Sequence, residues 1–168
     1  MPVNLEVKAY LHNPEDALKK LETLVPVPVK KILQKDIYYQ VSRGRFKLRQ
    51  INEGEFELIY YLRDEKNDIR KSVYEVSKFP SESNIGRILE DALGVVTIVK
   101  KYRYFSIYEN ARIHIDEVEG LGWFIEFEIP VQNDERNSEK LSYYLMDYFQ
   151  IKKEDIIKTS YLDLKIGK

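Results

Sequence analysis

Charged side chains recur at every second position in several segments of this sequence, a spacing that gathers them on one face of a β-strand. Arg45, Lys47 and Arg49 alternate with apolar residues, and their nitrogen donors match the oxygens of a phosphate group. Glu126 and Glu128 repeat the pattern with carboxylates, which suit Mg²⁺ or Mn²⁺. If the basic and acidic faces meet in one cavity, they indicate a site for a polyphosphate and a divalent metal ion. Such an ion neutralises the charge that develops when a phosphoryl group is transferred.

The same division into a charged and an apolar face extends to other segments. Glu6 and Lys8 share the even-numbered face of the first segment, whereas its odd-numbered face is apolar. The basic residues on the charged strand faces are the candidate phosphate ligands: Lys8, Lys47, Arg49, Lys101, Arg103 and Arg112. The candidate metal ligands are Glu6, Asp116, Glu126 and Glu128.

Each motif also has an ordinary structural explanation. Glu126 and Glu128 are compatible with the solvated face of a surface strand. The basic residues from 45 to 49 would also serve as a guard that stops a strand edge from pairing. His114 fits a spacer or a hydrogen-bonding residue better than a metal ligand, because the sequence has only one other histidine, His12. The joint pattern therefore carries more weight than any single motif.

Composition limits the classes of protein that the chain can belong to. Its 27 basic residues nearly balance its 28 acidic ones, so no overall charge directs the protein to nucleic acid or to an anionic membrane. The absence of cysteine excludes disulfides and thiolate sites. The first residues lack the pattern of a secretion signal, and no apolar run is long enough to span a membrane. We therefore expect a cytoplasmic protein with a small-molecule partner.

Alternation and composition predict the elements that position these residues. Eight segments have the character of strands: 3–10, 34–41, 45–51, 56–63, 71–77, 95–105, 109–117 and 123–131. Amphipathic helices are expected at 14–24, 82–93 and 134–149. A chain of 168 residues suits one hydrophobic core, so the sequence indicates a single α+β domain over residues 1–168.

Two ways of closing the strands into a barrel are compatible with this parity. In the first, the apolar faces point inward around an apolar ligand, as in a lipocalin-like carrier. In the second, the charged faces line the interior, where charges must be paired or bound to ions. Three amphipathic helices need an apolar surface to cover, and this requirement favours the second closure.

Four stretches of the chain resemble the CYTH superfamily, the triphosphate tunnel metalloenzymes. They are Glu6-Val7-Lys8, Gly44-Arg45-Phe46-Lys47-Leu48-Arg49, Lys100-Lys101-Tyr102-Arg103, and the segment from Asn110 to Glu128. In the last stretch, Arg-Ile-His-Ile-Asp, Gly-Leu-Gly and Glu-x-Glu look most like the class IV adenylyl cyclases and their archaeal relatives. The resemblance covers essentially the whole chain.

The resemblance implies an eight-stranded antiparallel β-barrel, the triphosphate tunnel, with a charged lumen and helices packed outside it. It implies that a triphosphate is bound by Lys8, Lys47, Arg49, Arg63, Lys101, Arg103 and Arg112. It implies catalytic roles for Glu6, Lys8, Lys101 and Arg103. It also implies that Mg²⁺ or Mn²⁺ is held by Glu6, Asp116, Glu126 and Glu128.

Two positions depart from the pattern of the family. Asn4 stands where the opening Glu-x-Glu-x-Lys motif has its first Glu, which removes one charge from the metal site and leaves the number of metal ions open. Tyr61 stands where many relatives have a Lys on the fourth strand. Arg63, two residues later, is the candidate replacement.

The nearest branch of the family implies an adenylate cyclase that converts ATP to cyclic AMP and pyrophosphate. The alternative enzyme is a triphosphatase that hydrolyses thiamine triphosphate, a nucleoside triphosphate or inorganic tripolyphosphate. The departure at Asn4 keeps a noncatalytic triphosphate-binding protein open as a third reading. Because paired barrels are common among small β enzymes, a homodimer is also compatible with the sequence.

Overall fold

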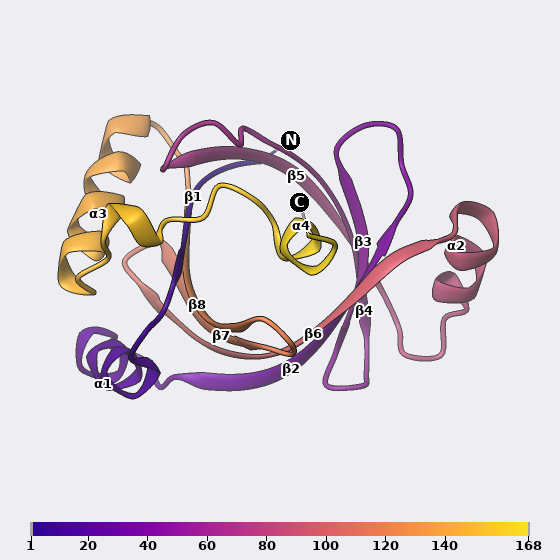
Figure 1. Ribbon diagram of the computed structural model, residues 1–168, viewed down its shortest axis with the longest axis horizontal. Helices are drawn as coiled ribbons and strands as arrows, with labels where there is room; N and C mark the ends of the chain where they lie inside the picture. The colour runs from indigo at the N-terminus through magenta and orange to yellow at the C-terminus, as the bar shows by residue number, and fades with distance from the viewer. Residues whose placement is uncertain (1, 168) are drawn as a thin grey trace.

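A computed structural model describes residues 2–167 and forms one closed antiparallel barrel (Figure 1). Its strands are β1 (Val3–Tyr10), β2 (Lys30–Tyr39), β3 (Arg45–Ile51), β4 (Phe56–Arg63), β5 (Arg70–Phe79), β6 (Val95–Tyr108), β7 (Ala111–Val118) and β8 (Gly122–Pro130). Around the barrel they follow the order β1-β5-β4-β3-β2-β6-β7-β8. This arrangement confirms the predicted α+β barrel, with shifts of up to four residues at the ends of individual strands.

The helices include the three that the sequence predicts and one that it does not. They are α1 (Pro14–Leu24), α2 (Ile85–Leu93), α3 (Glu135–Tyr148) and α4 (Tyr161–Lys165), with a short 3₁₀ helix at Lys153–Asp155. Helix α2 begins three residues later than expected, because Pro80 to Ser83 forms a turn in which the amide of Ser83 donates to the carbonyl oxygen of Pro80.

Side chains that accept hydrogen bonds from free backbone amides fix the starts of three helices. Asn13 accepts from the amide of Asp16 at the start of α1, and Asp134 accepts from that of Arg136 at the start of α3. Helix α4 begins with a reciprocal capping box, because Ser160 and Asp163 each bond the backbone amide of the other. This box gives a helix of only five residues a defined start.

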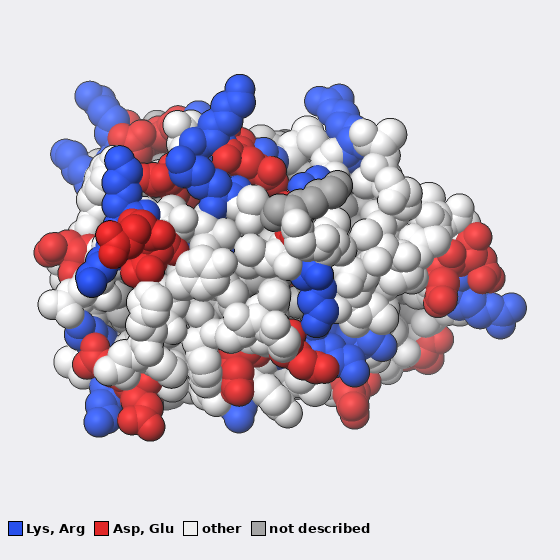
Figure 2. Space-filling model, viewed as in Figure 1, with Lys and Arg blue, Asp and Glu red and all other residues white. Residues whose placement is uncertain are grey.

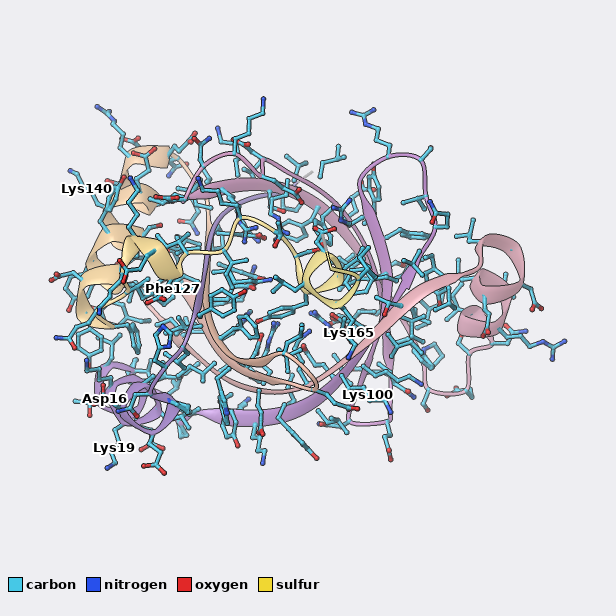
Figure 3. All side chains as sticks on the ribbon, in the orientation of Figure 1. Asp16, Lys19, Lys100, Phe127, Lys140 and Lys165 are labelled. Carbon is cyan, nitrogen blue, oxygen red and sulfur yellow. The ribbon has the colours of Figure 1, made fainter. Side chains whose placement is uncertain are left out.

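The apolar faces of the strands point outward and are covered by helices. A core of buried residues joins β1, β7 and β8 to α1 and α3, which lie together on one side of the barrel in Figure 1. Phe127 on β8 is fully buried and packs 5.7 Å from the ring of Phe149 at the end of α3; Figure 3 shows it at this boundary. The lipocalin-like closure, with apolar side chains inside, is therefore wrong.

Helix α2 covers less of the barrel than its apolar spacing suggests. It lies at the far end of the molecule from α1 and α3 (Figure 1) and approaches β3 where Gly86 meets Leu48. A Cβ added to Gly86 would lie 3.3 Å from Leu48 Cδ2, so glycine permits the close contact. Ile88 on the same helix stays 52% exposed, which differs from the expectation of a fully covered apolar face.

On the face that Figure 2 shows, neither sign of charge dominates. Acidic and basic side chains are mixed on the face that Figure 2 shows, in keeping with the net charge of −1. Among residues 2–167, no helix combines the length and apolar character needed to cross a membrane. Other charged side chains are buried, among them Lys8, Asp36 and Lys101.

The turn between β2 and β3 fixes the register of the basic strand. Gly44 has a φ of +73°, and a Cβ at this position would lie 2.8 Å from the carbonyl oxygen of Tyr61. The resulting register places Asp36 directly opposite Arg49. Gly44 is thus required both by its backbone conformation and by the close approach of β4.

Replacing Gly44 with alanine should destabilise the protein more than replacing Gly94. Gly94 also has a positive φ, with a ψ of 146°, but a Cβ there meets nothing within 4 Å, so Gly94→Ala carries only the backbone strain of about 1–3 kcal/mol. Gly44→Ala adds a clash worth roughly another 1–3 kcal/mol. Thermal unfolding should show a drop in Tm of roughly 2–4 °C per kcal/mol for each variant. Equal drops would contradict the steric role of Gly44.

Candidate active site

The interior of the barrel encloses a cavity of about 430 Å³. All seven basic residues that the sequence analysis assigns to triphosphate binding line it: Lys8, Lys47, Arg49, Arg63, Lys101, Arg103 and Arg112. The acidic residues on its walls are Glu6, Glu57, Glu126 and Glu128. Within residues 2–167, basic side chains therefore outnumber acidic ones around the cavity, and the excess favours an anionic ligand.

One carboxylate organises the basic wall. Asp36 on β2 is fully buried, and it accepts hydrogen bonds from Lys47 Nζ at 2.9 Å and Lys101 Nζ at 3.0 Å. Arg49 donates to both of its oxygens, from Nε at 2.7 Å and Nη2 at 2.8 Å. The carboxylate thus fixes three cationic side chains from β3 and β6 in one place, where they can face a ligand together.

The charges in this cluster shift the pKa values of its members. Burial opposes ionisation of Asp36, but the positive charges of Arg49, Lys101 and Lys47 outweigh it and hold the pKa well below its ordinary value. Burial also lowers the pKa of Lys101 to about 7, against the opposing charge of Asp36. Burial thus weakens proton binding by Lys101, and a further anion beside its ammonium group would strengthen it.

Asp36 was not among the residues predicted from the sequence, although it lies on the same strand face as Gln34 and Tyr38, which line the cavity. The adjacent Lys35 conceals the alternation because two charged residues stand side by side. Lys35 is half-buried and Asp36 is fully buried. The inward parity of the strand was the signal that could have identified Asp36.

The acidic wall is formed by β7 and β8. Glu126 and Glu128 point into the cavity from alternate positions of β8, and His114 on β7 lies directly opposite Glu126 in the strand register. One oxygen or nitrogen atom from each of the three side chains lies within 4.8 Å of the others. Two of the four metal ligands expected from the sequence thus meet here, joined by His114, which was expected to be a spacer or a hydrogen-bonding residue.

Burial and mutual repulsion perturb the ionisation of these groups. Burial, followed by the charge of Glu126, raises the pKa of Glu128, whereas Lys8 and Arg103 keep the pKa of Glu126 low despite burial. Burial also holds the pKa of His114 well below its ordinary value, so its imidazole is neutral at pH 7. Two close carboxylates and a neutral imidazole form a donor set that a divalent cation would stabilise.

The other two expected metal ligands are engaged by arginines. Glu6 accepts a hydrogen bond from Arg63 Nη1 at 3.3 Å. Asp116 is fully buried and accepts two hydrogen bonds from Arg103, each at 2.8 Å. The hydroxyl of Tyr161 donates to it as well, at 2.8 Å. Both oxygens of Asp116 are engaged, so it would have to release Arg103 before it could bind a metal ion, whereas Arg63 contacts only Oε2 of Glu6.

Helix α4 closes one end of the barrel and contributes to the site. In Figure 1 it lies within the outline of the barrel, and Ser160 and Tyr161 line the cavity. The ring of Tyr161 lies 3.7 Å from Lys8 Nζ, and Asp163 accepts two hydrogen bonds from Arg45 at the start of β3. Arg45 shares the parity of Lys47, yet its ion pair anchors the helix. The sequence signal for α4 was the Ser-x-x-Asp capping box.

Three arginines keep buried nitrogen atoms that make no hydrogen bond within residues 2–167. They are Nε of Arg45, Nε and Nη2 of Arg63, and Nε and Nη2 of Arg70. Arg70 is fully buried, at the first position of β5, and burial lowers its pKa to about 10. The predicted strand began at residue 71, so Arg70 was overlooked. Unpaired guanidinium donors of this kind are costly unless a ligand or water satisfies them.

The end of the cavity away from α4 has an apolar side, here called the apolar mouth, while the charged residues Glu57, Arg112 and Glu128 lie at the same end. Ile32, Ile51 and Phe105 line it and lie at the ends of β2, β3 and β6 opposite those that pack on α4. Ile59 and Val76 complete this apolar mouth, and Val76 is 46% exposed. A ligand could therefore place charged groups among the basic residues and an uncharged group at the mouth.

A closed antiparallel barrel that gathers basic and acidic side chains around one internal cavity is the architecture of a triphosphate tunnel. Residues 3–161 match the family model of the CYTH domain, and the chain belongs to the CYTH domain family.

One curated protein and two solved structures are similar to this chain over nearly its whole length. A Methanocaldococcus jannaschii protein named "Putative adenylate cyclase MJ0240" is 26% identical over 97% of this chain and 98% of its own. The PH1012 protein from Pyrococcus horikoshii has a similar structure, with a TM-score of 0.79 at 24% identity over 96% of this chain and 98% of that one. The HpAC1 protein from Hippeastrum, described as having a dominant triphosphatase activity, has a TM-score of 0.63 at 15% identity over 100% and 97%.

Replacing Asp36 with asparagine should destabilise the fold strongly. The substitution keeps the side-chain shape but leaves Lys47, Arg49 and Lys101 without their shared counter-charge, and breaking a buried ion pair in this way costs about 3–5 kcal/mol. Asp16→Asn is the matched control, because Asp16 is exposed and its pair with Lys20 contributes at most about 0.5 kcal/mol. Denaturant unfolding compares the two. Similar losses would show that Asp36 does not hold the cluster together.

Lys101 should make the free energy of unfolding rise with pH between about 7 and 10.5. Its pKa is about 7 in the folded chain, whereas its ordinary pKa is 10.5. In this window the unfolded chain binds more protons than the folded one, so stability increases with pH. Below pH 7 the ammonium is charged in both states and the contribution is constant.

The variant Lys101→Met should reduce this rise to the smaller contribution of Lys8, whose pKa burial lowers to about 8. Lys100→Met should preserve the full rise, because Lys100 is exposed on the outside of the same strand (Figure 3). Denaturant titrations at several pH values measure the slopes. A wild-type slope in Lys101→Met would contradict the lowered pKa.

Proposed function

We propose that this protein is a metal-dependent enzyme acting on a nucleoside triphosphate, most directly an adenylate cyclase that forms cyclic AMP and pyrophosphate from ATP. The observation that carries the proposal is the convergence of seven basic side chains, together with Glu126 and Glu128, on one internal cavity. CYTH family proteins bind triphosphates and generally depend on metal ions. The adenylate cyclase name of the archaeal relative supports the particular reaction.

The division of the cavity supports a nucleotide rather than inorganic tripolyphosphate. Basic residues would bind the phosphate oxygens, bidentately in the case of arginine. The apolar mouth would receive the base and part of the ribose, since it offers Ile32, Ile51 and Phe105. A tripolyphosphate would leave this apolar surface without a partner.

Each group of residues would have a separate role. The triphosphate would be held by Lys47, Arg49 and Lys101 on the Asp36 wall, and by Lys8, Arg63, Arg103 and Arg112 on the other walls. Lys8, Lys101 and Arg103 would also stabilise the charge that develops at phosphorus, which is the basis of their proposed catalytic role. Glu6 would position Arg63 through their ion pair.

Glu126 and Glu128 would hold Mg²⁺ or Mn²⁺, and their oxygen atoms suit either ion. A bound divalent ion supplies positive charge beside the phosphate oxygens as the reaction proceeds. Lys8 contacts Glu126 at 3.3 Å and Arg112 contacts Glu128 at 3.0 Å, so cations already orient both carboxylates. Glu6 would join the set through Oε1, which Arg63 does not contact, and Asp116 would join only after its ion pair with Arg103 opens.

In the cyclase reaction, the ribose 3′ oxygen attacks the α-phosphorus, its proton is released, and the bond to the bridging oxygen breaks so that pyrophosphate leaves. The basic walls would hold the α-phosphorus close to the ribose by fixing the other two phosphates, which lowers the entropic part of the barrier. Closure of one barrel end by α4 would limit access of water, which would otherwise compete with the 3′-hydroxyl.

A triphosphatase is the second candidate, and the activity described for HpAC1 favours it. In that reaction, water attacks the terminal phosphorus and orthophosphate leaves. The same residues would bind the substrate, but the terminal phosphate would lie beside Glu126 and Glu128. The position of the triphosphate along the cavity would therefore decide between the two reactions.

Incubation with Mn²⁺ or Mg²⁺ and each of ATP, thiamine triphosphate and tripolyphosphate should separate these candidates. Cyclic AMP with pyrophosphate is the expected result, and release of orthophosphate from any substrate would identify a triphosphatase. If no substrate is converted but tripolyphosphate raises the Tm, the protein is a noncatalytic binder. The absence of both conversion and stabilisation would contradict the proposal.

The double variant Glu126→Gln/Glu128→Gln should lose activity at least about 100-fold while remaining folded. The matched control is Glu117→Gln/Glu119→Gln, which removes the same charge from exposed positions on β7 and the following turn. Product formation and thermal unfolding are measured for both proteins. Full activity in the first variant would eliminate the proposed metal ligands.

A further inference from the structure

His114 is a buried side chain with an unused nitrogen atom inside the cavity. It is 5% exposed, and its Nδ1 atom has no hydrogen-bond partner within residues 2–167. A buried polar atom without a partner is costly. The position therefore calls for a ligand that binds this nitrogen.

The surroundings of His114 point to the kind of ligand. Its Nδ1 lies 3.9 Å from Glu126 Oε1, a separation too long for a hydrogen bond. Lys8 and Arg112 contact the Oε2 atoms of Glu126 and Glu128, so Oε1 of Glu126 is the oxygen that faces the imidazole. A small cation between these atoms would satisfy the nitrogen and the two carboxylates together.

The spacing of the three side chains is compatible with coordination. Their nearest potential ligand atoms lie within 4.8 Å of one another, whereas ligand atoms around an octahedral ion are roughly 3 Å apart when adjacent and roughly 4 Å apart when opposite. Small side-chain rotations would close the difference. Because β7 and β8 are adjacent and hydrogen-bonded, with His114 opposite Glu126, the backbone holds the donors in place.

We propose that His114 is a metal ligand, so that the metal centre of this protein combines one imidazole nitrogen with the carboxylates of Glu126 and Glu128. This inference rests on the proposed metal-dependent function of the same cavity. An imidazole suits first-row transition metals, while Mg²⁺ prefers oxygen atoms alone. The centre is therefore selective for Mn²⁺ or Co²⁺ over Mg²⁺, and His114 is the residue that determines this selectivity.

Electron spin echo envelope modulation of the protein loaded with Mn²⁺ alone tests the proposal without any assay of activity. Nitrogen modulation from a bound imidazole is expected in the wild-type protein and in His12→Gln. His12 is the only other histidine and is 75% exposed at its side chain, which makes it a matched control. The modulation should disappear in His114→Gln, and Mn²⁺ affinity should fall roughly tenfold or more.

Isotope labelling tests the same ligand in a protein that keeps His114. In the His12→Gln protein grown with ¹⁵N-histidine, His114 carries the only labelled imidazole, so the nitrogen frequencies should change to those of ¹⁵N. Mn²⁺ binding without nitrogen modulation, or modulation that the label does not change, would overturn the role of His114 and leave the carboxylate metal site intact. Failure of Mn²⁺ to bind would overturn both this role and the proposed metal dependence.

Discussion

The ion pairs inside the barrel are the interaction on which the rest of the structure depends. A buried charge without a partner costs several kcal/mol, and this chain buries Asp36, Lys101 and Asp116 almost completely. Asp36 meets this cost by contacting three cations. The outward apolar faces and the helices that cover them follow from the same arrangement, because strands that turn charge inward must turn isoleucine, valine and phenylalanine outward.

The charges around the cavity are not fully paired within residues 2–167, and this favours the binding of charged ligands. Basic side chains exceed acidic ones around it, so an anion would complete the balance on the Asp36 wall. On the opposite wall, Glu126 and Glu128 repel each other, so a divalent cation would balance the negative charge of that wall. A triphosphate with its metal ion supplies both charges at once. The two walls thus explain why substrate and metal would bind together rather than independently.

Period-two alternation placed charged residues such as Lys47 and Glu128 on one strand face, because they stand between apolar neighbours, and the three amphipathic helices favoured the closure that turns this face inward. Asp36 was hidden by the adjacent Lys35, and Arg70 lay one position before its predicted strand. Pairwise contacts could not be predicted, since the register that sets Arg49 opposite Asp36 depends on the turn at Gly44. The five-residue helix α4 was too short for a periodic signal, although its capping box was present.

A crystal structure with Mn²⁺ and a nonhydrolysable ATP analogue would test the central claim most directly, with anomalous scattering to locate the metal. The account predicts phosphate oxygens within hydrogen-bond distance of Lys47, Arg49 and Lys101, and a manganese peak beside Glu126 and Glu128. The adenine should lie at the apolar mouth. An analogue bound on the outer surface, with no ligand among the basic residues of the barrel, would contradict the account.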